Sequence, residues 1–344
     1  MHMADALVSP AVGGAMWAAA AGLTAYSAKK VRLDPDEKKV PLMGVLGAFI
    51  FAAQMINFTI PGTGSSGHLG GGLLLAALLG PYAGFLTMAS ILAVQGFFFG
   101  DGGLLAMGCN IFNLGFYPCF IAYPLLFKPI VGKRPTPGRI LAGASLAAIV
   151  GLQLGSFSVV LETLVSGISE LPFRAFLWLM QPVHLAIGIV EGLITAAVLT
   201  FVWKARPELL ESTVAGAAYG DLDLKKVLIS LSIAAALTGG ALSWFASTHP
   251  DGLEWALFHA SGKEELEAPA GIHQTMAGIQ EKTAILPDYG FKTPAENAAA
   301  ESEPVERWPA VSGGTSFAGL VGGLFTLLLT GVIGYGLRMV KKRG

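Results

Sequence analysis

The feature that most constrains this chain is a series of nine apolar runs spread along almost the whole sequence. Most of them approach the ~20 residues that a helix needs to cross a bilayer. We place these runs at residues 10–27, 41–58, 69–80, 82–99, 104–127, 139–165, 173–203, 224–247 and 315–338. Only 13% of the side chains are charged, against about 25% in a soluble domain. We therefore expect an all-α integral membrane protein of the cell membrane, with the lipid bilayer as its solvent.

The run at 69–80 is too short to cross a membrane alone, but the distribution of charge indicates that it crosses. Basic residues gather in the loops 28–40, 128–138 and 204–226 and in the C-terminal tail, and the positive-inside rule places such segments in the cytoplasm. Counting 69–80 as a crossing puts the first two basic loops on the same side. We expect residues before Leu69 to lengthen this helix, which gives nine crossings with the N-terminus outside and the C-terminus in the cytoplasm.

The basic run near the middle of the chain divides the sequence into two parts. We assign residues 1–206 to a seven-helix membrane domain and residues 207–344 to a two-helix appendage. The appendage carries a long, acidic insert at 248–314, which the topology places outside, and its stretch 293–306 is typical of a linker. The formal net charge of -1 gives no basic field for nucleic acid, so we expect no nucleic-acid partner.

The chain begins Met1-His2, which can form a chelate. The terminal amine, the amide nitrogen of His2 and its imidazole Nδ1 can close a five- and a six-membered ring on one metal ion. These three nitrogens lie naturally in a plane, and a fourth donor would complete a square, the geometry that favours Ni(II) or Cu(II). The metal must displace protons from the amine, which titrates near ~8 when unbound, so uptake should weaken in acid. We expect Met1 to be retained, because a bulky residue such as His2 disfavours its removal.

The glycine-rich stretch 62–67 leads directly to His68, the candidate for the fourth donor. It fits the pattern GxGxxG, but we expect no strand before it and therefore no dinucleotide site. We expect its glycines to let the backbone fold inward and aim His68 at a ligand. The topology places this loop on the same outer side as His2. Without that proximity, a lone histidine in a turn is more often solvated or hydrogen-bonded than bound to a metal.

Polar residues within apolar runs gather toward the outer ends of three expected helices. They could orient the metal-binding nitrogens as a second shell, or they could join helices by hydrogen bonds. These residues are Gln54, Asn57, Gln95, Asn110 and Asn113.

Further polar groups lie deeper in the expected helices. His184 and Glu191 are seven residues apart on one face of the run 173–203, which indicates a buried pair or, together with Glu162, a proton relay. Cys109 and Cys119 are too far apart for a CxxC clamp and are expected to be buried packing. No GxxxxGK[ST] motif occurs, so ATP-driven activity would need a partner.

Three motifs together resemble those of the NikM/CbiM family, the substrate-binding components of energy-coupling-factor nickel/cobalt transporters. They are the start Met1-His2, the run Gly67-His68-Leu69-Gly70-Gly71 and the run Gly108-Cys109-Asn110. The appendage resembles the small NikN component through Pro250-Asp251-Gly252-Leu253-Glu254. Asp5-Ala6 departs from the more usual Pro-Asp-Gly type run of the family.

The resemblance implies a seven-helix bundle with an extra leading helix, followed by a two-helix accessory part. It also implies a square-planar metal site made by Met1, His2 and His68, and partners in the form of a transmembrane coupling subunit and cytoplasmic ATPase subunits. We expect high-affinity capture of Ni(II) at the outer membrane face, by a transport subunit that is not an enzyme. The alternatives are Co(II) as the ion, or a proton-coupled secondary metal transporter that uses His184 and Glu191.

Overall fold

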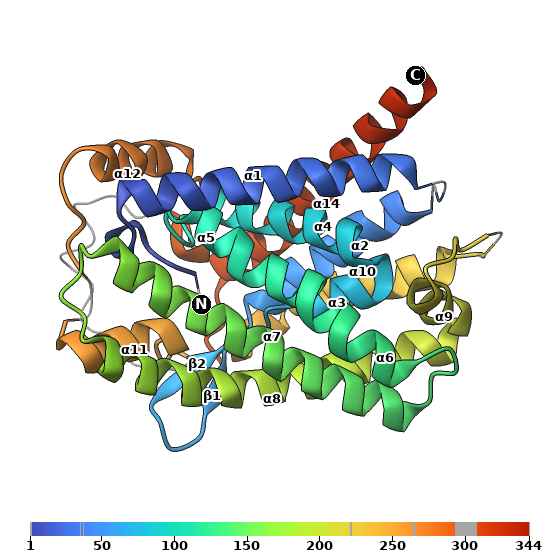
Figure 1. The fold of residues 1–344 in the computed structure, drawn as a ribbon, viewed down its shortest axis with the longest axis horizontal. Coiled ribbons are helices and arrows are strands. Elements are labelled where there is room, and N and C mark those ends of the chain that lie inside the picture. The colour runs from blue at the N-terminus through green and yellow to red at the C-terminus, as the bar shows by residue number, and fades with distance from the viewer. Residues whose placement is uncertain are drawn as a thin grey trace.

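The structure is a computed structural model that describes residues 2–34, 36, 38–220, 222–263, 266–292 and 308–343. Long helices run side by side along the longest axis of the molecule (Figure 1). Met1 and the expected linker at 293–306 lie outside the described residues.

The first part of the chain forms the helices of the main bundle. A short 3-10 helix η1 (Asp5–Leu7) precedes α1, whose first turn is capped by Ser9 through a hydrogen bond from the Val12 backbone N–H at 3.4 Å. The helices that follow are α1 (Pro10–Leu33), α2 (Lys39–Gln54), α3 (Gly72–Leu79), α4 (Pro81–Val94) with its π-type end η2 (Gln95–Phe99), α5 (Met107–Ile111), the π-type helix η3 (Phe112–Phe127), α6 (Lys128–Val131), α7 (Pro137–Ser166) and α8 (Phe173–Ala205). Cys109 and Cys119 are both buried and free, as expected.

The second part adds two long helices and a cap of short ones. Its helices are α9 (Pro207–Ala215), α10 (Lys225–Gly240), η4 (Leu242–Phe245), α11 (Gly252–Ser261), α12 (Ile272–Thr283), η5 (Pro287–Tyr289) and α14 (Gly313–Arg343). Both α10 and α14 pack against α2 of the first part. The two parts therefore share a helix interface within the bundle.

Among the described residues, five helices are long and apolar enough to cross a membrane. They are Pro81–Phe99, Met107–Val131, Pro137–Ser166, Phe173–Ala205 and Gly313–Met339, and they coincide with five of the nine expected runs. Lys39–Gln54 is a shorter apolar helix. The nine-crossing topology stays a prediction.

The run at 69–80 differs from its expected form. Only Gly72–Leu79 is helical, which corresponds to a rise of about 12 Å. The residues before it do not lengthen the helix, because Ser65–Gly67 form strand β2, which pairs antiparallel with β1 (Phe58–Ile60). This hairpin is the one exception, within the described residues, to the all-α expectation.

The segments expected in the cytoplasm lie at one end of the molecule. The α1–α2 connection, α6, α9 and the C-terminus are on the right in Figure 1, whereas the β1–β2 hairpin, α11 and α12 are on the left. This arrangement agrees with the sidedness expected from the basic loops. Which end faces outward stays a prediction.

Candidate metal centre

The N-terminal lead, which we define as residues 2–8, lies inside the molecule. Met3, Leu7 and Val8 are fully buried. The Asn110 side chain binds both backbone groups of Met3: the Met3 N–H donates to Asn110 Oδ1 at 2.7 Å, and Asn110 Nδ2 donates to the Met3 carbonyl at 3.2 Å. The Gly103 N–H gives the same carbonyl a second donor at 2.9 Å. The backbone next to His2 is therefore fixed.

The glycine loop, residues 65–71, brings His68 toward the same place. The carboxylate of Glu191 in α8 accepts hydrogen bonds from the N–H groups of Gly70 and Gly71, both at 3.0 Å, and Gln54 Nε2 donates to the Gly70 carbonyl at 2.8 Å. Gly71 has φ +78°, and a Cβ there would lie 2.6 Å from Ile50. The loop needs glycine at this position both for its left-handed backbone and for the close approach of α2.

The two imidazoles stack on each other. The ring centroids of His2 and His68 are 5.2 Å apart, with 16° between the ring planes. No three of the described histidine, cysteine, aspartate or glutamate side chains are close enough to hold a metal ion. A complete site at this place therefore depends on nitrogens from the start of the chain, of which Met1 lies outside the described residues.

The ring nitrogens of the two histidines have different partners. His68 Nδ1 lies 3.0 Å from the Leu69 carbonyl, so Nδ1 carries the hydrogen and Nε2 the lone pair. His2 Nδ1 lies 2.8 Å from Asp101 Oδ1, and His2 Nε2 is buried without a hydrogen-bond partner among the residues that the structure describes. A chelate through His2 Nδ1, as the sequence predicts, therefore requires this nitrogen to leave Asp101.

Burial and neighbouring groups set the charge states of this centre. Burial lowers the pKa of His68 to about 3, which keeps its imidazole neutral. Burial alone would raise the pKa of Asp101, but the charge and hydrogen bond of His2 and the hydroxyl of Tyr289 lower it below its usual value. Asp101 is thus an ionised carboxylate beside a neutral His68.

Two of the five polar residues expected around the site, Gln54 and Asn110, bind backbone next to the histidines. Gln95 Nε2 donates to Gln54 Oε1 at 2.9 Å, which supports the clamp on Gly70. Asn113 Nδ2 donates to Glu162 at 2.8 Å and lies 3.9 Å from the sulfur of Met3. Asn57 contributes its backbone carbonyl, which accepts from the Ser247 N–H at 2.7 Å. Orientation of the imidazole nitrogens by these side chains stays a prediction.

The expected buried pair of His184 and Glu191 is wrong. Both side chains are buried in α8, but His184 Nδ1 binds the Met180 carbonyl at 2.8 Å, whereas Glu191 binds the glycine loop. Glu162 binds Asn113 and Ser158. Each member of the hypothetical proton relay therefore has a partner that is not another member.

Sequence reasoning missed three residues of this centre. Asp101 holds His2, the hydroxyl of Tyr289 donates to Asp101, and Asp251 lies with His68 along one cavity. Two of the three come from the accessory part. The signal that could have found Asp251 is the run Pro250–Glu254 itself, which the sequence analysis used only as a resemblance.

The accessory part also docks directly on the glycine loop. The Ser66 N–H donates to the Pro250 carbonyl at 2.8 Å, and Ser66 Oγ donates to the His249 carbonyl at 2.8 Å. Ser66 and Asp251 form a parallel bridge. A hollow of about 1510 Å³ opens beside this contact and reaches His2 and His68, with the carboxylates of Asp101, Asp251 and Glu254 on its walls. These carboxylates suit the passage of a cation.

Comparison with known proteins identifies two regions. Residues 2–209 match the model of the CbiM family, described as the cobalt uptake substrate-specific transmembrane region, and residues 225–339 match that of the PDGLE domain. The fused nickel transport protein NikMN of Rhodobacter capsulatus is 29% identical over 310 residues, which are 84% of this chain and 88% of that protein. A protein of Archaeoglobus fulgidus provisionally carries the same name. It is 33% identical over 233 residues, which are 68% of this chain and 75% of that protein. The crystal structure of a truncated transition metal transporter superposes with a TM-score of 0.53 and 29% identity, covering 60% of this chain and 99% of that chain.

Proposed function

We propose, from the premise that this chain belongs to the CbiM family of substrate-specific membrane components and carries a PDGLE domain, that it captures Ni(II) at the outer face of the cell membrane. The family makes it a multi-pass transport protein for nickel or cobalt and not an enzyme. The choice of nickel and the set of ligands are our proposal.

The proposed ligands are four nitrogens. The amine of Met1, the amide nitrogen and Nδ1 of His2, and Nε2 of His68 would surround the ion in a square. An all-nitrogen square favours Ni(II) over Co(II) for two reasons. Square-planar coordination is typical of Ni(II), and Ni(II) binds more strongly than Co(II) in the general affinity order of divalent ions. Co(II) is the alternative cargo.

The observation that supports this proposal best is the stacking of His2 and His68, at 5.2 Å between ring centroids. The two residues are 66 positions apart in the sequence. Each is held by its own backbone clamp, through Asn110 on one side and Glu191 on the other. Such supporting contacts keep the residues that bind the metal in a productive geometry.

The protein would act as the receptor of a larger importer. Because the chain has no nucleotide-binding P-loop, we propose that a transmembrane coupling subunit and cytoplasmic ATPase subunits drive transport. We propose nine crossings, with the N-terminus outside and the C-terminus in the cytoplasm, which would put the metal centre on the side from which the ion arrives.

The decisive experiment compares nickel content and optical spectrum among three forms of the full chain. They are the protein with a native Met1, the protein with an extension of about ten residues ahead of Met1, and His68→Ala. We expect a square-planar Ni(II) d–d band in the native form that is lost in both others. His249→Ala is the matched control, because this exposed histidine of the insert contributes only its backbone to the contacts above. Equal nickel in all forms would refute the terminal chelate, and a parallel titration with Co(II) ranks the two ions.

The same preparation tests the effect of pH. The terminal amine, with a pKa near ~8 when free, and the His2 amide must both give up protons. Nickel binding should therefore weaken as the pH falls from 8 to 6, with protons released on binding. Release of protons is measured by calorimetry in buffers of different ionisation enthalpy, and nickel binding without any proton release would contradict the chelate.

A further inference from the structure

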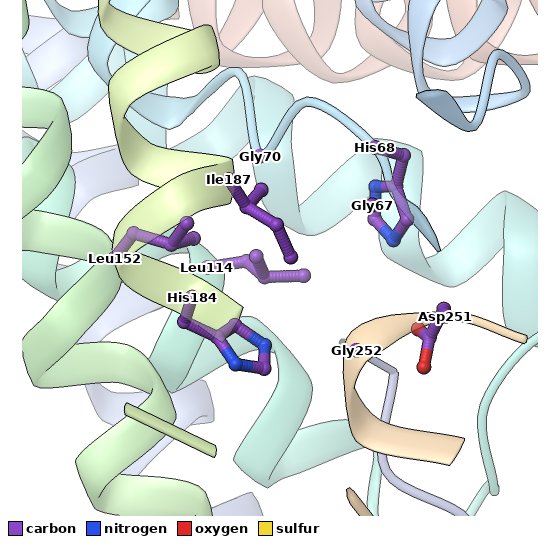
Figure 2. A pocket seen from close by; sticks show the side chains of 9 residues that line it. All are labelled: Gly67, His68, Gly70, Leu114, Leu152, His184, Ile187, Asp251 and Gly252. Atoms are coloured by element: carbon purple, nitrogen blue, oxygen red, sulfur yellow. The ribbon is translucent and has the colours of Figure 1, made fainter. Parts of the chain in front are cut away.

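A small cavity lies beside His68, and neither His2 nor Asp101 is among its lining residues. Its lining includes three side chains that can bind a cation, His68, His184 and Asp251, from three separate elements of the fold. Figure 2 shows the ring of His184 directed into this cavity from α8, with His68 and Asp251 on the far side. The cavity volume of about 10 Å³ corresponds to the space for one water molecule.

His184 has the arrangement of a metal ligand. The residue is 1% exposed, and its Nδ1 lies 2.8 Å from the carbonyl of Met180, one helical turn earlier. The hydrogen is therefore on Nδ1 and the lone pair on Nε2. A histidine that binds a metal usually donates its other ring nitrogen in this way, which fixes both tautomer and orientation.

His184 Nε2 has no hydrogen-bond partner among the described residues. A buried acceptor that stays unsatisfied carries a desolvation penalty, so this atom favours a ligand such as water or a cation. The backbone of Gly252 crosses close to the ring, since a Cβ on Gly252 would lie 3.3 Å from His184 Cε1. The accessory part thus closes the cavity over an imidazole lone pair.

The other two groups complement this lone pair. His68 has the same tautomer, because its Nδ1 binds the Leu69 carbonyl. The Asp251 carboxylate is oriented by the N–H groups of Leu253 and Glu254, at 2.8 and 2.9 Å, and it brings a negative charge to the cavity. Two imidazole lone pairs and a carboxylate suit Ni(II), Co(II) or Zn(II) in a geometry other than a square.

We propose that His184 Nε2 forms, together with His68 Nε2, a second and inner binding position for the divalent cation, with Asp251 balancing its charge. This inference rests on the proposed function, because the inner position shares His68 with the terminal chelate. An ion can pass between the two positions while His68 holds it. Since the three side chains do not converge on one point in this structure, the inner position binds weakly, which suits transfer better than storage.

The test separates the two positions by blocking the outer one. The full-length protein with an extension of about ten residues ahead of Met1 is titrated with cobalt(II) chloride, and the visible absorption of Co(II) is followed. We expect one weak equivalent with a non-square spectrum. In the same blocked background, His184→Ala and His68→Ala should each lower the Co(II) affinity at least about tenfold, the loss seen when support of a metal site is removed.

His259→Ala is the matched control for this experiment. His259 also binds the carbonyl one turn earlier, Trp255, at 2.8 Å, but it is exposed in α11. Its loss should leave the Co(II) titration unchanged. His184→Gln serves as a second variant should alanine disturb the fold, and gel filtration and thermal unfolding verify that each variant is folded.

Two results would overturn the inner position. The blocked protein could bind no Co(II), which would mean that the cavity holds only water, or it could bind Co(II) equally well without His184. Neither result affects the terminal chelate, which is judged separately from the square-planar nickel band of the unblocked protein. Conversely, absence of that band in the unblocked protein would refute the chelate while leaving the Co(II) titration to decide on His184.

Discussion

The N-terminal lead and the glycine loop bring their histidines together with different clamps. The lead presents one N–H and one carbonyl of Met3, and the amide of Asn110 matches both. The glycine loop presents two successive N–H groups, and the carboxylate of Glu191 accepts both. Each side chain matches the backbone groups that it binds. An amide serves where the backbone offers one donor and one acceptor, and a carboxylate serves where it offers two donors.

The clamps also differ in redundancy. The Met3 carbonyl has a second donor in the Gly103 N–H, whereas Glu191 alone accepts from Gly70 and Gly71 in the described structure. Loss of the carboxylate should therefore cost more than loss of the amide. This difference sets the order of the predictions that follow.

The largest effect is expected for Glu191→Ala. Two buried N–H groups lose their acceptor, at about 1–3 kcal/mol each, and the loop that carries His68 is released. We expect a clear fall in the thermal unfolding midpoint in detergent and nickel binding weakened by about a hundredfold or more. Glu191→Gln should fall between this variant and the wild type, because its amide keeps only one acceptor.

Glu170→Ala is the control, since this carboxylate is exposed just before α8. The clamp also means that Glu191→Gln cannot distinguish a terminal chelate from a proton relay. Without the clamp, a terminal chelate would tolerate Glu191→Gln, whereas a proton relay would not. The clamp makes both mechanisms sensitive to this substitution, so the N-terminal extension is the variant that separates them. Full nickel binding by Glu191→Ala would contradict the clamp.

A smaller effect is expected for Asn110→Ala. The Met3 N–H loses its acceptor, but the Met3 carbonyl keeps Gly103, so the cost should be about 1–3 kcal/mol in total. Nickel affinity should fall about tenfold, with the square-planar spectrum retained at saturation. If calorimetry showed Asn110→Ala to be more damaging than Glu191→Ala, the argument from redundancy would be wrong.

The dependence of stability on pH sharpens the comparison on the His68 side. The folded pKa of His68 is about 3, below the usual value near ~6.5, so below pH 6.5 the unfolded chain binds a proton that the folded protein does not. Stability should therefore be lost as the pH falls from 6.5 toward 3, by up to about 1.4 kcal/mol per unit from this residue. The metal-free protein is heated at pH 7, 6 and 5, and His68→Gln should show a shallower fall than the wild type. Equal slopes would contradict the burial of His68.

The smallest effect is expected for Ser66→Ala, which tests how the accessory part holds the glycine loop. The variant loses the hydroxyl contacts to the His249 and Pro250 carbonyls but keeps the backbone N–H bond to Pro250, for about 0.5–1.5 kcal/mol. Amide hydrogen exchange of residues 247–254 should speed up, with little change in nickel content. Ser65→Ala is the control, because its hydroxyl binds Thr63 within the hairpin; the same acceleration there would show that the hairpin itself had loosened.

The sequence was sufficient for the long helices and insufficient for the loop between them. Runs such as 139–165 and 173–203 exceed the thickness of a bilayer, so length and composition alone predict α7 and α8. The stretch before α3 has no such signal. Ser65–Gly67 instead pair with Phe58–Ile60 in a hairpin, and Ser66 of this strand binds Pro250, a partner 184 positions away in the sequence.

The candidate site was predictable to a similar degree. His2 and His68 could be proposed from the chemistry of a chain start and from the resemblance, and the structure places their rings together. Their proposed role as ligands stays a prediction, as does the division of the chain at residue 206. Asp101 and the carboxylate clamp of Glu191 could not be foreseen, because a carboxylate that binds distant backbone groups leaves no pattern in the local sequence.

The docking of Pro250 and Asp251 on Ser66 has a further consequence, because both partners belong to one chain. Covalent connection turns the encounter into an intramolecular event with an effective concentration in the millimolar range. Contacts that would be too weak to join two separate proteins can then keep the accessory part in place for most of the time. The accessory segment can also leave and return quickly without being lost, so brief exposure of the histidines does not require dissociation of a subunit.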